Sequence, residues 1–199
     1  MPSIEELPKP ARVTGGCLCG AVRFRVDFPR GYDFVKNTGT CQCTQCRRNS
    51  GSVFWSCVQV PKVCLRWGKV DEKNTSASQI EEWTHERPPS ALRSFSATPG
   101  IRRGFCATCG GFLTWMKDEG SLVHVSVGTI DPVYLVGPSD DPEVAKTDVD
   151  GEEVPKGGYG PILAGGYGRN LWCSNEIKGV TDDLAAVGVG RGKRSSQND

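Results

Sequence analysis

Histidine is scarce in this chain, since only His85 and His124 occur among its 199 residues. No Ser/His/Asp triad pattern is present, and the glycine-rich stretches lack the strand–turn–helix context of a phosphate-binding loop, which argues against triad hydrolases and nucleotide-binding enzymes. The formal net charge is +1, so no overall field attracts nucleic acid or an anionic membrane. No apolar run approaches the roughly 18 residues needed to span a bilayer. We therefore expect neither nucleic acid nor a membrane as a partner.

Long helical stretches are lacking as well. The chain contains 25 glycines and 13 prolines, which favour turns and interrupt helices, so the sequence predicts an all-β protein with little helix. One domain is the default at this length, and we place it at residues 13–188, after a flexible lead over 1–12 and before a disordered tail over 189–199. The lead contains three prolines and no apolar core segment, unlike a signal peptide. We expect a cytoplasmic protein.

Cysteine, in contrast, is abundant and clustered. Seven of the ten cysteines fall into a Cys-x-Cys step, a Cys-x-Cys-x-x-Cys run and a Cys-x-x-Cys step, which are ligand spacings because a turn can direct neighbouring sulfurs at one cation. A disulfide framework is the alternative, although disulfide-rich chains are usually small and secreted. The isolated Cys57, Cys64 and Cys173 are expected to be buried small apolar residues.

Seven thiolates suggest two zinc ions. A structural zinc site uses four protein ligands, and a catalytic zinc keeps three protein ligands and one open position. The Cys17/Cys19 and Cys106/Cys109 pairs together supply four thiolates, which leaves a three-thiolate unit of Cys41, Cys43 and Cys46. A competing arrangement pairs Cys43/Cys46 with Cys106/Cys109 and leaves the other three, and spacing alone does not choose between the two.

The clusters lie in turns between expected strands. Alternating residues predict strands over 21–26, 53–60, 101–105, 112–116 and 122–127. Residues 63–67 are expected to pair with 53–60, and Cys106 and Cys109 to occupy the tip of a hairpin. Cys43 and Cys46 would begin a short helix that stops at Gly51. The Gly-, Pro- and Asp-rich segment 137–169 is expected to be a long loop, and its Gly-Gly-Tyr-Gly stretches a lid over the open site, before a last strand near 170.

Three motifs resemble those of the glutathione-dependent formaldehyde-activating enzyme/centromere protein V family. They are GGCLCGAVRF at 15–24, CQCTQCRRNSG at 41–51 and RRGFCATCGG at 102–111, and the GTIDP at 128–132 also matches. The resemblance implies a zinc-binding β-tent fold built from several small antiparallel sheets. It also implies a structural zinc and a catalytic zinc, whose ligands are respectively Cys17, Cys19, Cys106, Cys109 and Cys41, Cys43, Cys46.

The activity implied is a carbon–sulfur lyase reaction, the condensation of formaldehyde with glutathione. Two positions depart from the family pattern. Gln42 stands where members commonly carry histidine, and Arg47-Arg48-Asn49 stands where the members associated with glutathione tend to show Trp-Lys-Pro. These departures bear on the substrate rather than on the metal sites.

The residues themselves indicate how an open three-thiolate site would work. Coordination to zinc deprotonates a thiol, and the resulting thiolate is a nucleophile. We therefore expect a small-molecule thiol and a carbonyl as substrates. Arg47 or Arg48 would bind a substrate carboxylate, unless both are solvated helix surface. His124 is the candidate general base, and His85 is expected at the surface. A zinc-stabilised protein-interaction module is the alternative, in which a fourth protein ligand such as Cys57 closes the second site.

Overall fold

The computed structural model describes residues 3–68, 82–85, 88–140, 144, 152–182 and 193–195, the last segment by its backbone alone. Parts of two predicted segments therefore lie outside the described residues: the long loop over 137–169 and the tail over 189–199. Within the described part, no helix is both long and apolar enough to cross a membrane.

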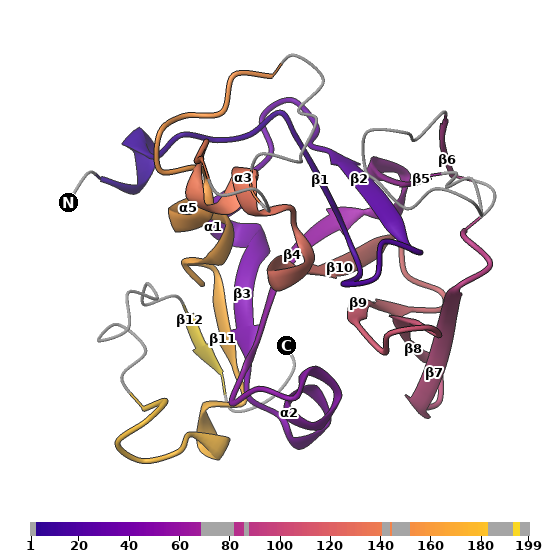
Figure 1. Cartoon of the computed structure of the whole chain (residues 1–199). Coiled ribbons are helices and arrows are strands. Elements are labelled where there is room, and N and C mark those ends of the chain that lie inside the picture. Colours follow the sequence, from indigo (N-terminus) through magenta and orange to yellow (C-terminus); the bar gives the residue numbers. More distant parts are fainter. Residues whose placement is uncertain are drawn as a thin grey trace.

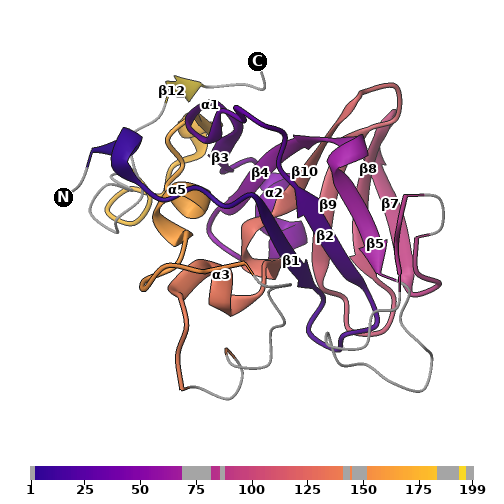
Figure 2. The same ribbon diagram turned by 90° about the horizontal axis from the view of Figure 1, so that it is seen from above.

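The described chain is mostly β-structure, as the sequence predicted, and forms two sheets (Figures 1 and 2). The smaller sheet has the order β1-β2-β5-β6, with β1 Arg12–Gly16, β2 Arg23–Asp27, β5 Leu65–Gly68 and β6 Trp83–Thr84. The larger sheet has the order β12-β11-β3-β4-β10-β9-β8-β7. Its strands are β12 Lys193–Ser195, β11 Arg169–Leu171, β3 Thr38–Cys41, β4 Trp55–Pro61, β10 Leu122–Ser126, β9 Phe112–Lys117, β8 Ile101–Cys106 and β7 Leu92–Thr98.

The sheets share one apolar core. Alternation along β2 buries Phe24 and Val26 completely, and alternation along β10 buries Val123 and Val125 in the same cluster. Both views place the small sheet beside the β8–β10 part of the larger one. Strands that alternate in this way bury one face and leave the other to solvent, which accounts for the two-sheet arrangement.

The larger sheet is not wholly antiparallel. β11 pairs in parallel with both β3 and β12, so the end of the sheet that carries β3 differs from the small antiparallel sheets that the family resemblance implied. Gly39 of β3 faces Arg169 of β11, and a Cβ at Gly39 would overlap the Arg169 carbonyl oxygen. The glycine therefore permits the close approach of these two strands.

The predicted pairing of residues 53–60 with 63–67 is wrong. β4 pairs with β3 and β10, whereas β5 pairs with β2 and β6 in the other sheet. The two are separated by a 3-10 turn at Lys62–Cys64, which follows Pro61 and redirects the chain. A two-residue hairpin would need Pro61 and Lys62 as turn residues, and here the chain crosses between sheets instead.

The described helices are short: α1 Phe34–Asn37, α2 Thr44–Ser50, α3 Pro132–Val136 and α5 Gly160–Ala164. Helix α2 begins after Cys43 and ends at Gly51, whose φ of 64° is the left-handed conformation of a helix C-terminus. Helix α5 lies in the predicted loop and buries Ile162 and Leu163 completely in the core. The described part of this segment is thus a packed element.

The termini are also partly structured. Within the expected lead over 1–12, Ile4–Glu6 forms a 3-10 turn and Leu7 packs in the core. Within the expected tail over 189–199, Lys193–Ser195 forms β12. The domain limits at residues 13 and 188 stay predictions.

A buried ion pair fixes the small sheet to the segment that follows β10. Arg23 of β2 donates to both carboxylate oxygens of Asp131 at 2.8 and 2.5 Å, and the Thr14 hydroxyl donates to the same carboxylate at 2.5 Å. Breaking such a pair on one side leaves an uncompensated buried charge. This pair holds β1 and β2, and therefore the turn with Cys17 and Cys19, against the larger sheet.

Candidate functional site

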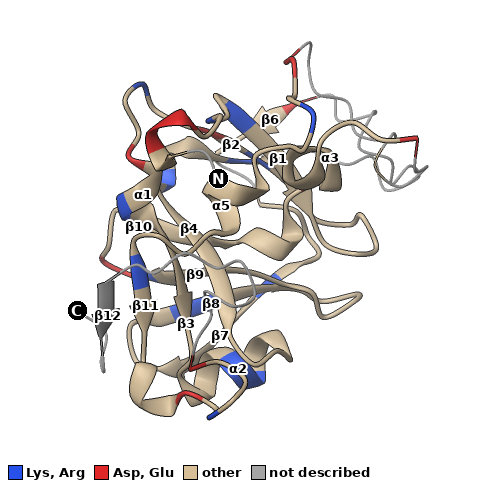
Figure 3. Cartoon of the chain, turned by 90° about the vertical axis from the view of Figure 1, so that its left-hand side faces the viewer, with Lys and Arg blue, Asp and Glu red and all other residues tan. Residues whose placement is uncertain are grey.

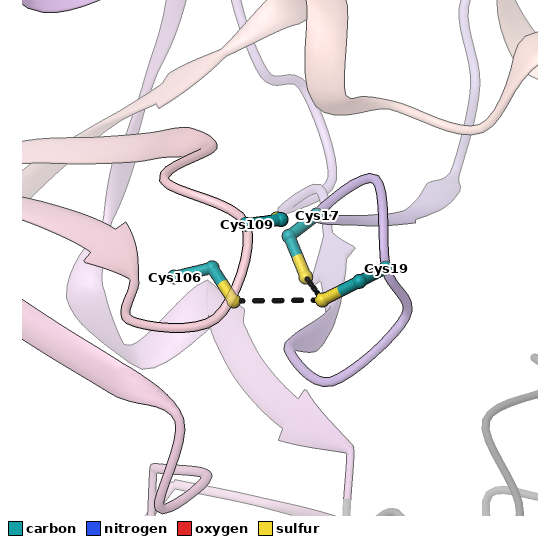
Figure 4. Close-up of side chains that lie close together, drawn as sticks. All are labelled: Cys17, Cys19, Cys106 and Cys109. Atoms are coloured by element: carbon teal, nitrogen blue, oxygen red, sulfur yellow. Dashed lines mark hydrogen bonds between the residues drawn. The ribbon is translucent and has the colours of Figure 1, made fainter.

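Four cysteines from the two sheets meet in one cluster. Cys17 and Cys19 lie in the turn between β1 and β2, and Cys106 and Cys109 lie in the turn of the β8–β9 hairpin, as the sequence predicted (Figure 4). All four sulfurs lie within 4.8 Å of one another. The cluster therefore joins the small sheet to the large one at a point where two turns face each other.

The four sulfurs suit a tetrahedral zinc ion. The Cys17–Cys19 and Cys19–Cys106 Sγ distances are 3.6 and 3.7 Å, and zinc–sulfur bonds in a tetrahedron place sulfurs about 3.8 Å apart. Burial raises the pKa of Cys17 to about 12, so a cation is needed to hold this group of sulfurs as thiolates. Backbone N–H groups of Val22 and Thr108 point at the Cys17 and Cys106 sulfurs, which is the usual support of a thiolate ligand.

Three further cysteines form a second cluster at the start of α2. Cys41 ends β3, Cys43 is the residue before α2 and accepts the Cys46 backbone N–H at 3.3 Å, and Cys46 lies in the first helical turn. Their sulfurs also lie within 4.8 Å of one another. The structure thus brings together the same sets of four and three cysteines that counting gave, and it does not bring Cys43 and Cys46 to Cys106 and Cys109.

The charges of the three-cysteine cluster call for a cation. The contacts with Cys41 and Cys46 lower the pKa of Cys43 to about 2, whereas the contact with Cys43 raises the pKa of Cys41 to about 12 and the contact with Cys41 raises that of Cys46. The first thiolate opposes the ionisation of the other two sulfurs, because like charges this close repel. A divalent ion would compensate the other two, and thiolate ligands select zinc among common divalent ions.

All ten cysteines are free thiols, so the disulfide framework is not formed. Cys57 is buried as expected, whereas Cys64 and Cys173 are half-buried. Among the residues that the structure describes, neither Cys57 nor His124 belongs to the three-cysteine set. This cluster therefore has three protein ligands in the described chain.

A cavity of about 580 Å³ opens onto the three-cysteine cluster. It is formed by β3, β4, β8–β11, the ends of α1 and β7 and the start of α2, and three tryptophans line it: Trp55, Trp115 and Trp172. Trp172 has a φ of 60°, a left-handed conformation that bulky residues rarely adopt. Strained residues of this kind concentrate at binding sites. The described residues of 152–168, which include α5, do not line the cavity, so the predicted lid is not seen in them.

His124 lies in the wall of this cavity, as a general base would. Its Nδ1 is 3.6 Å from the Cys57 sulfur, and its ring packs edge-on against Trp115. Burial raises the pKa of Cys57, and the tautomer of His124 decides which of the two groups donates in this contact. Burial, aided by the positive charges of Arg169 and Lys117, lowers the pKa of His124 to about 4.

The other sequence candidates lie elsewhere. Arg47 donates from Nε to the Val53 carbonyl and from Nη2 to Gln42 and to the Asn175 carbonyl. Neither Arg47 nor Arg48 lines the cavity, and Arg48 is exposed. His85 is exposed, as expected, and its Nδ1 contacts the Leu65 carbonyl. Arg47 therefore ties α2 to the chain around it, and its role in substrate binding stays a prediction.

Gln42 is also used structurally. Its side chain is completely buried, and its Oε1 accepts hydrogen bonds from Arg47 at 3.0 Å and from the Thr181 hydroxyl at 2.6 Å. Gln42 does not line the cavity, although both of its chain neighbours are in the cluster. The residue thus connects the three-cysteine cluster to the segment around 175–181.

Sequence reasoning missed Arg103, Arg169 and Trp172, which all line the cavity. Arg102 and Arg103 are adjacent in the sequence, but Arg102 is exposed and paired with Asp118 whereas Arg103 is buried. Alternation along β8 is the one signal that separates the two arginines, and it does not say which of them faces a cavity.

A pH-dependent loss of stability should identify His124 as a half-buried imidazole that is neutral in the folded protein. Its pKa is lowered from 6.5 to about 4 in the folded protein, so between these values the unfolded chain binds a proton that the folded chain does not, and stability falls as pH falls. Relative to His124→Gln, the native protein should lose about 3 kcal/mol between pH 7 and pH 4. Urea unfolding of both proteins across this range measures the difference, in which acid effects on the thiolates cancel. A difference that stays constant with pH would contradict the lowered pKa of His124.

Comparison with known proteins agrees with the motifs. A search of the curated proteins finds no match. Among solved structures, a crystal structure of a Rhodobacter sphaeroides protein is similar, with a TM-score of 0.42 and 20% identity over 60% of this chain and 89% of that chain. A family model described as glutathione-dependent formaldehyde-activating enzyme matches residues 12–144, which include both cysteine clusters and His124. The chain belongs to the family of glutathione-dependent formaldehyde-activating enzymes.

Proposed function

We propose that the protein is a zinc-dependent enzyme of the carbon–sulfur lyase type, which adds a small thiol to a small carbonyl such as formaldehyde, or catalyses the reverse elimination. The observation that carries the proposal is the cluster of Cys41, Cys43 and Cys46, whose three sulfurs face a cavity of about 580 Å³. A structural zinc site has four protein ligands, whereas a catalytic site has three and an open position that substrate can reach. The family supports thiol and aldehyde substrates.

Two zinc ions are part of this proposal. The four-cysteine cluster would hold a structural ion, and Cys41, Cys43 and Cys46 would hold the catalytic ion. Zinc in the second position would lower the pKa of a substrate thiol and so make it nucleophilic near neutral pH.

The chain's own residues orient the reactants and move the proton. In the forward direction the thiol sulfur forms a bond to the carbonyl carbon, the carbon–oxygen π bond opens, and the thiol proton passes to the oxygen. His124, neutral because its pKa is lowered to about 4, would accept the thiol proton at its free ring nitrogen and pass that proton to the developing oxyanion, so the ring ends the step neutral. Cys57 positions the ring through Nδ1. The tryptophan walls exclude water, which competes with the thiol for the carbonyl.

A non-catalytic protein-interaction module is the second candidate, and the fourth ligand distinguishes the two. Such a module would close the second zinc with a protein donor, and Cys57, which lines the same cavity, is the candidate. Cys57 contacts His124 and lies outside the three-cysteine set, and burial raises the pKa of its thiol. This arrangement favours the enzyme.

Cobalt substitution tests the proposal directly. In protein with Co²⁺ at both sites, added glutathione should increase the sulfur-to-cobalt charge-transfer absorption, because a thiolate enters the exchangeable position. Exchange between free formaldehyde and its glutathione adduct, followed by two-dimensional NMR, should be faster than in buffer. An absorption spectrum unchanged by glutathione, together with an exchange rate equal to that in buffer, would contradict the enzymatic function and favour the interaction module.

A further inference from the structure

The cavity beside the three-cysteine cluster is lined by positive charge. Lys36 of α1, Arg103 of β8, Lys117 of β9 and Arg169 of β11 all line it, and the described lining contains no aspartate or glutamate. Figure 3 shows positive residues on α1 and β11, along the side of the molecule where these elements lie. A cavity with cationic side chains from four elements and no acid attracts anions.

Arg103 is the buried member of this group. It is 4% exposed, and its Nη2 donates to the Gln45 Oε1 at 2.5 Å, while Nε and Nη1 are buried without any hydrogen-bond partner. Leaving charged donors buried and unpaired is costly in free energy. The guanidinium is therefore poised for an oxygen-bearing anion.

A second buried arginine in the same protein shows what a structural role looks like. Arg23 is 8% exposed and donates from both Nη atoms to the Asp131 carboxylate. Arg103 has no carboxylate partner within the described chain and only the neutral amide of Gln45, an exposed residue. A substrate carboxylate would therefore replace an amide oxygen as the acceptor for Arg103. This exchange is favourable because a hydrogen bond from a guanidinium to a charged acceptor is stronger than one to a neutral acceptor.

Arg103 lies at the right place for the thiol substrate. Gln45 stands between Cys43 and Cys46 in the chain, so its contact places the Arg103 guanidinium one side chain away from the three-cysteine cluster. A one-carbon carbonyl is scarcely larger than water, whose share of liquid volume is about 30 Å³. Most of the cavity of about 580 Å³ is therefore left for the thiol.

We propose that Arg103 is the specificity-determining residue of this cavity and binds a carboxylate of the thiol substrate. The proposal rests on the proposed function for the identity of the ligand as a thiol. It replaces Arg47 and Arg48 as the carboxylate-binding side chains, since Arg47 is engaged by backbone carbonyls and Arg48 lies outside the cavity. Arg169 of β11, whose Nη2 donates a long hydrogen bond of 3.4 Å to the Gln59 Oε1, adds a second guanidinium to the cavity lining.

Calorimetric titration with a pair of matched probes tests this without any reaction. The probes are S-methylglutathione and its dimethyl ester, which differ in carboxylate charge and lack a free thiol. The metal-loaded protein should bind the acid at least about tenfold more tightly than the ester, because charged hydrogen bonds in buried sites contribute that much. Arg103→Met should remove the preference, whereas Arg48→Met, a change at an exposed arginine, should retain it.

The outcomes separate this proposal from the proposed function. Equal binding of acid and ester by the native protein, or a full preference retained by folded Arg103→Met, would overturn it. Should circular dichroism show that Arg103→Met does not fold, Arg103→Lys decides, since lysine lacks the planar donor array and should reduce the preference at least about threefold. An undiminished preference in Arg103→Lys counts against it. If the native protein prefers the acid but does not catalyse formaldehyde exchange, the role of Arg103 is supported and the proposed reaction is contradicted. If it catalyses the exchange but binds acid and ester equally, the reaction is supported and the role of Arg103 is contradicted.

Discussion

Replacing Cys106 with serine is expected to unfold the protein. Cys106 is completely buried, and its cluster joins two turns that belong to different sheets. Structural zinc sites contribute about 10–16 kcal/mol to the folding of small zinc domains, whereas whole domains are stable by about 5–15 kcal/mol. Cys106→Ser should therefore lack a cooperative thermal transition by circular dichroism.

Cys64→Ser is the matched control, because Cys64 is half-buried and lies outside both clusters. It should melt like the native protein and retain two zinc ions per chain. If Cys106→Ser instead melts cooperatively with one zinc lost, the four-cysteine cluster does not hold the sheets together, and its structural role is wrong.

Replacing Cys43 with serine should have the opposite profile, with the fold retained and the activity lost. Cys43 is half-buried at the start of α2, and the three-cysteine cluster lies within one sheet and one helix rather than between sheets. Zinc content should fall from two ions to one. Thiol–formaldehyde exchange should fall at least about a thousandfold, since metal activation supplies several kcal/mol.

Mass spectrometry under native conditions counts the zinc, and exchange NMR measures the rate. Ser50→Ala, a change in the last turn of the same helix, provides a control for local disturbance of α2. One zinc ion in the native protein, or unfolding of Cys43→Ser, would mean that the central cluster is structural, and the catalytic assignment would then be wrong.

The sequence predicted those parts of the fold and site that depend on neighbours in the chain. The hairpin that presents Cys106 and Cys109, the helix that begins after Cys43, and the half-buried strand β10 all follow from local spacing and alternation. Ligand spacing likewise predicted the neighbouring cysteines that act together, because each such set is held by a single turn, whereas the structure decides which pairs join in the four-cysteine cluster.

The remaining features depend on contacts between distant segments. β3 is buried along its whole length and shows no alternation, so neither the strand nor its pairing with β11, about 130 residues further on, could be predicted from sequence. The crossing from β4 to β5 was missed because two adjacent strand-like segments favour a hairpin locally. Arg103 and Trp172 enter the site only because β8 and β11 meet the three-cysteine cluster from different parts of the chain.

Strand β8 carries both Arg103 and Cys106, only three residues apart, or about 10 Å along a strand. A short segment of one strand thus connects the four-cysteine cluster between the sheets to the side chain that would bind the substrate carboxylate. Oxidation of the half-exposed Cys109 would therefore disturb Arg103 through the same strand while it weakens the contact between the two sheets. Folding stability and the binding of an anionic substrate would then be lost together, because one strand carries a residue of each.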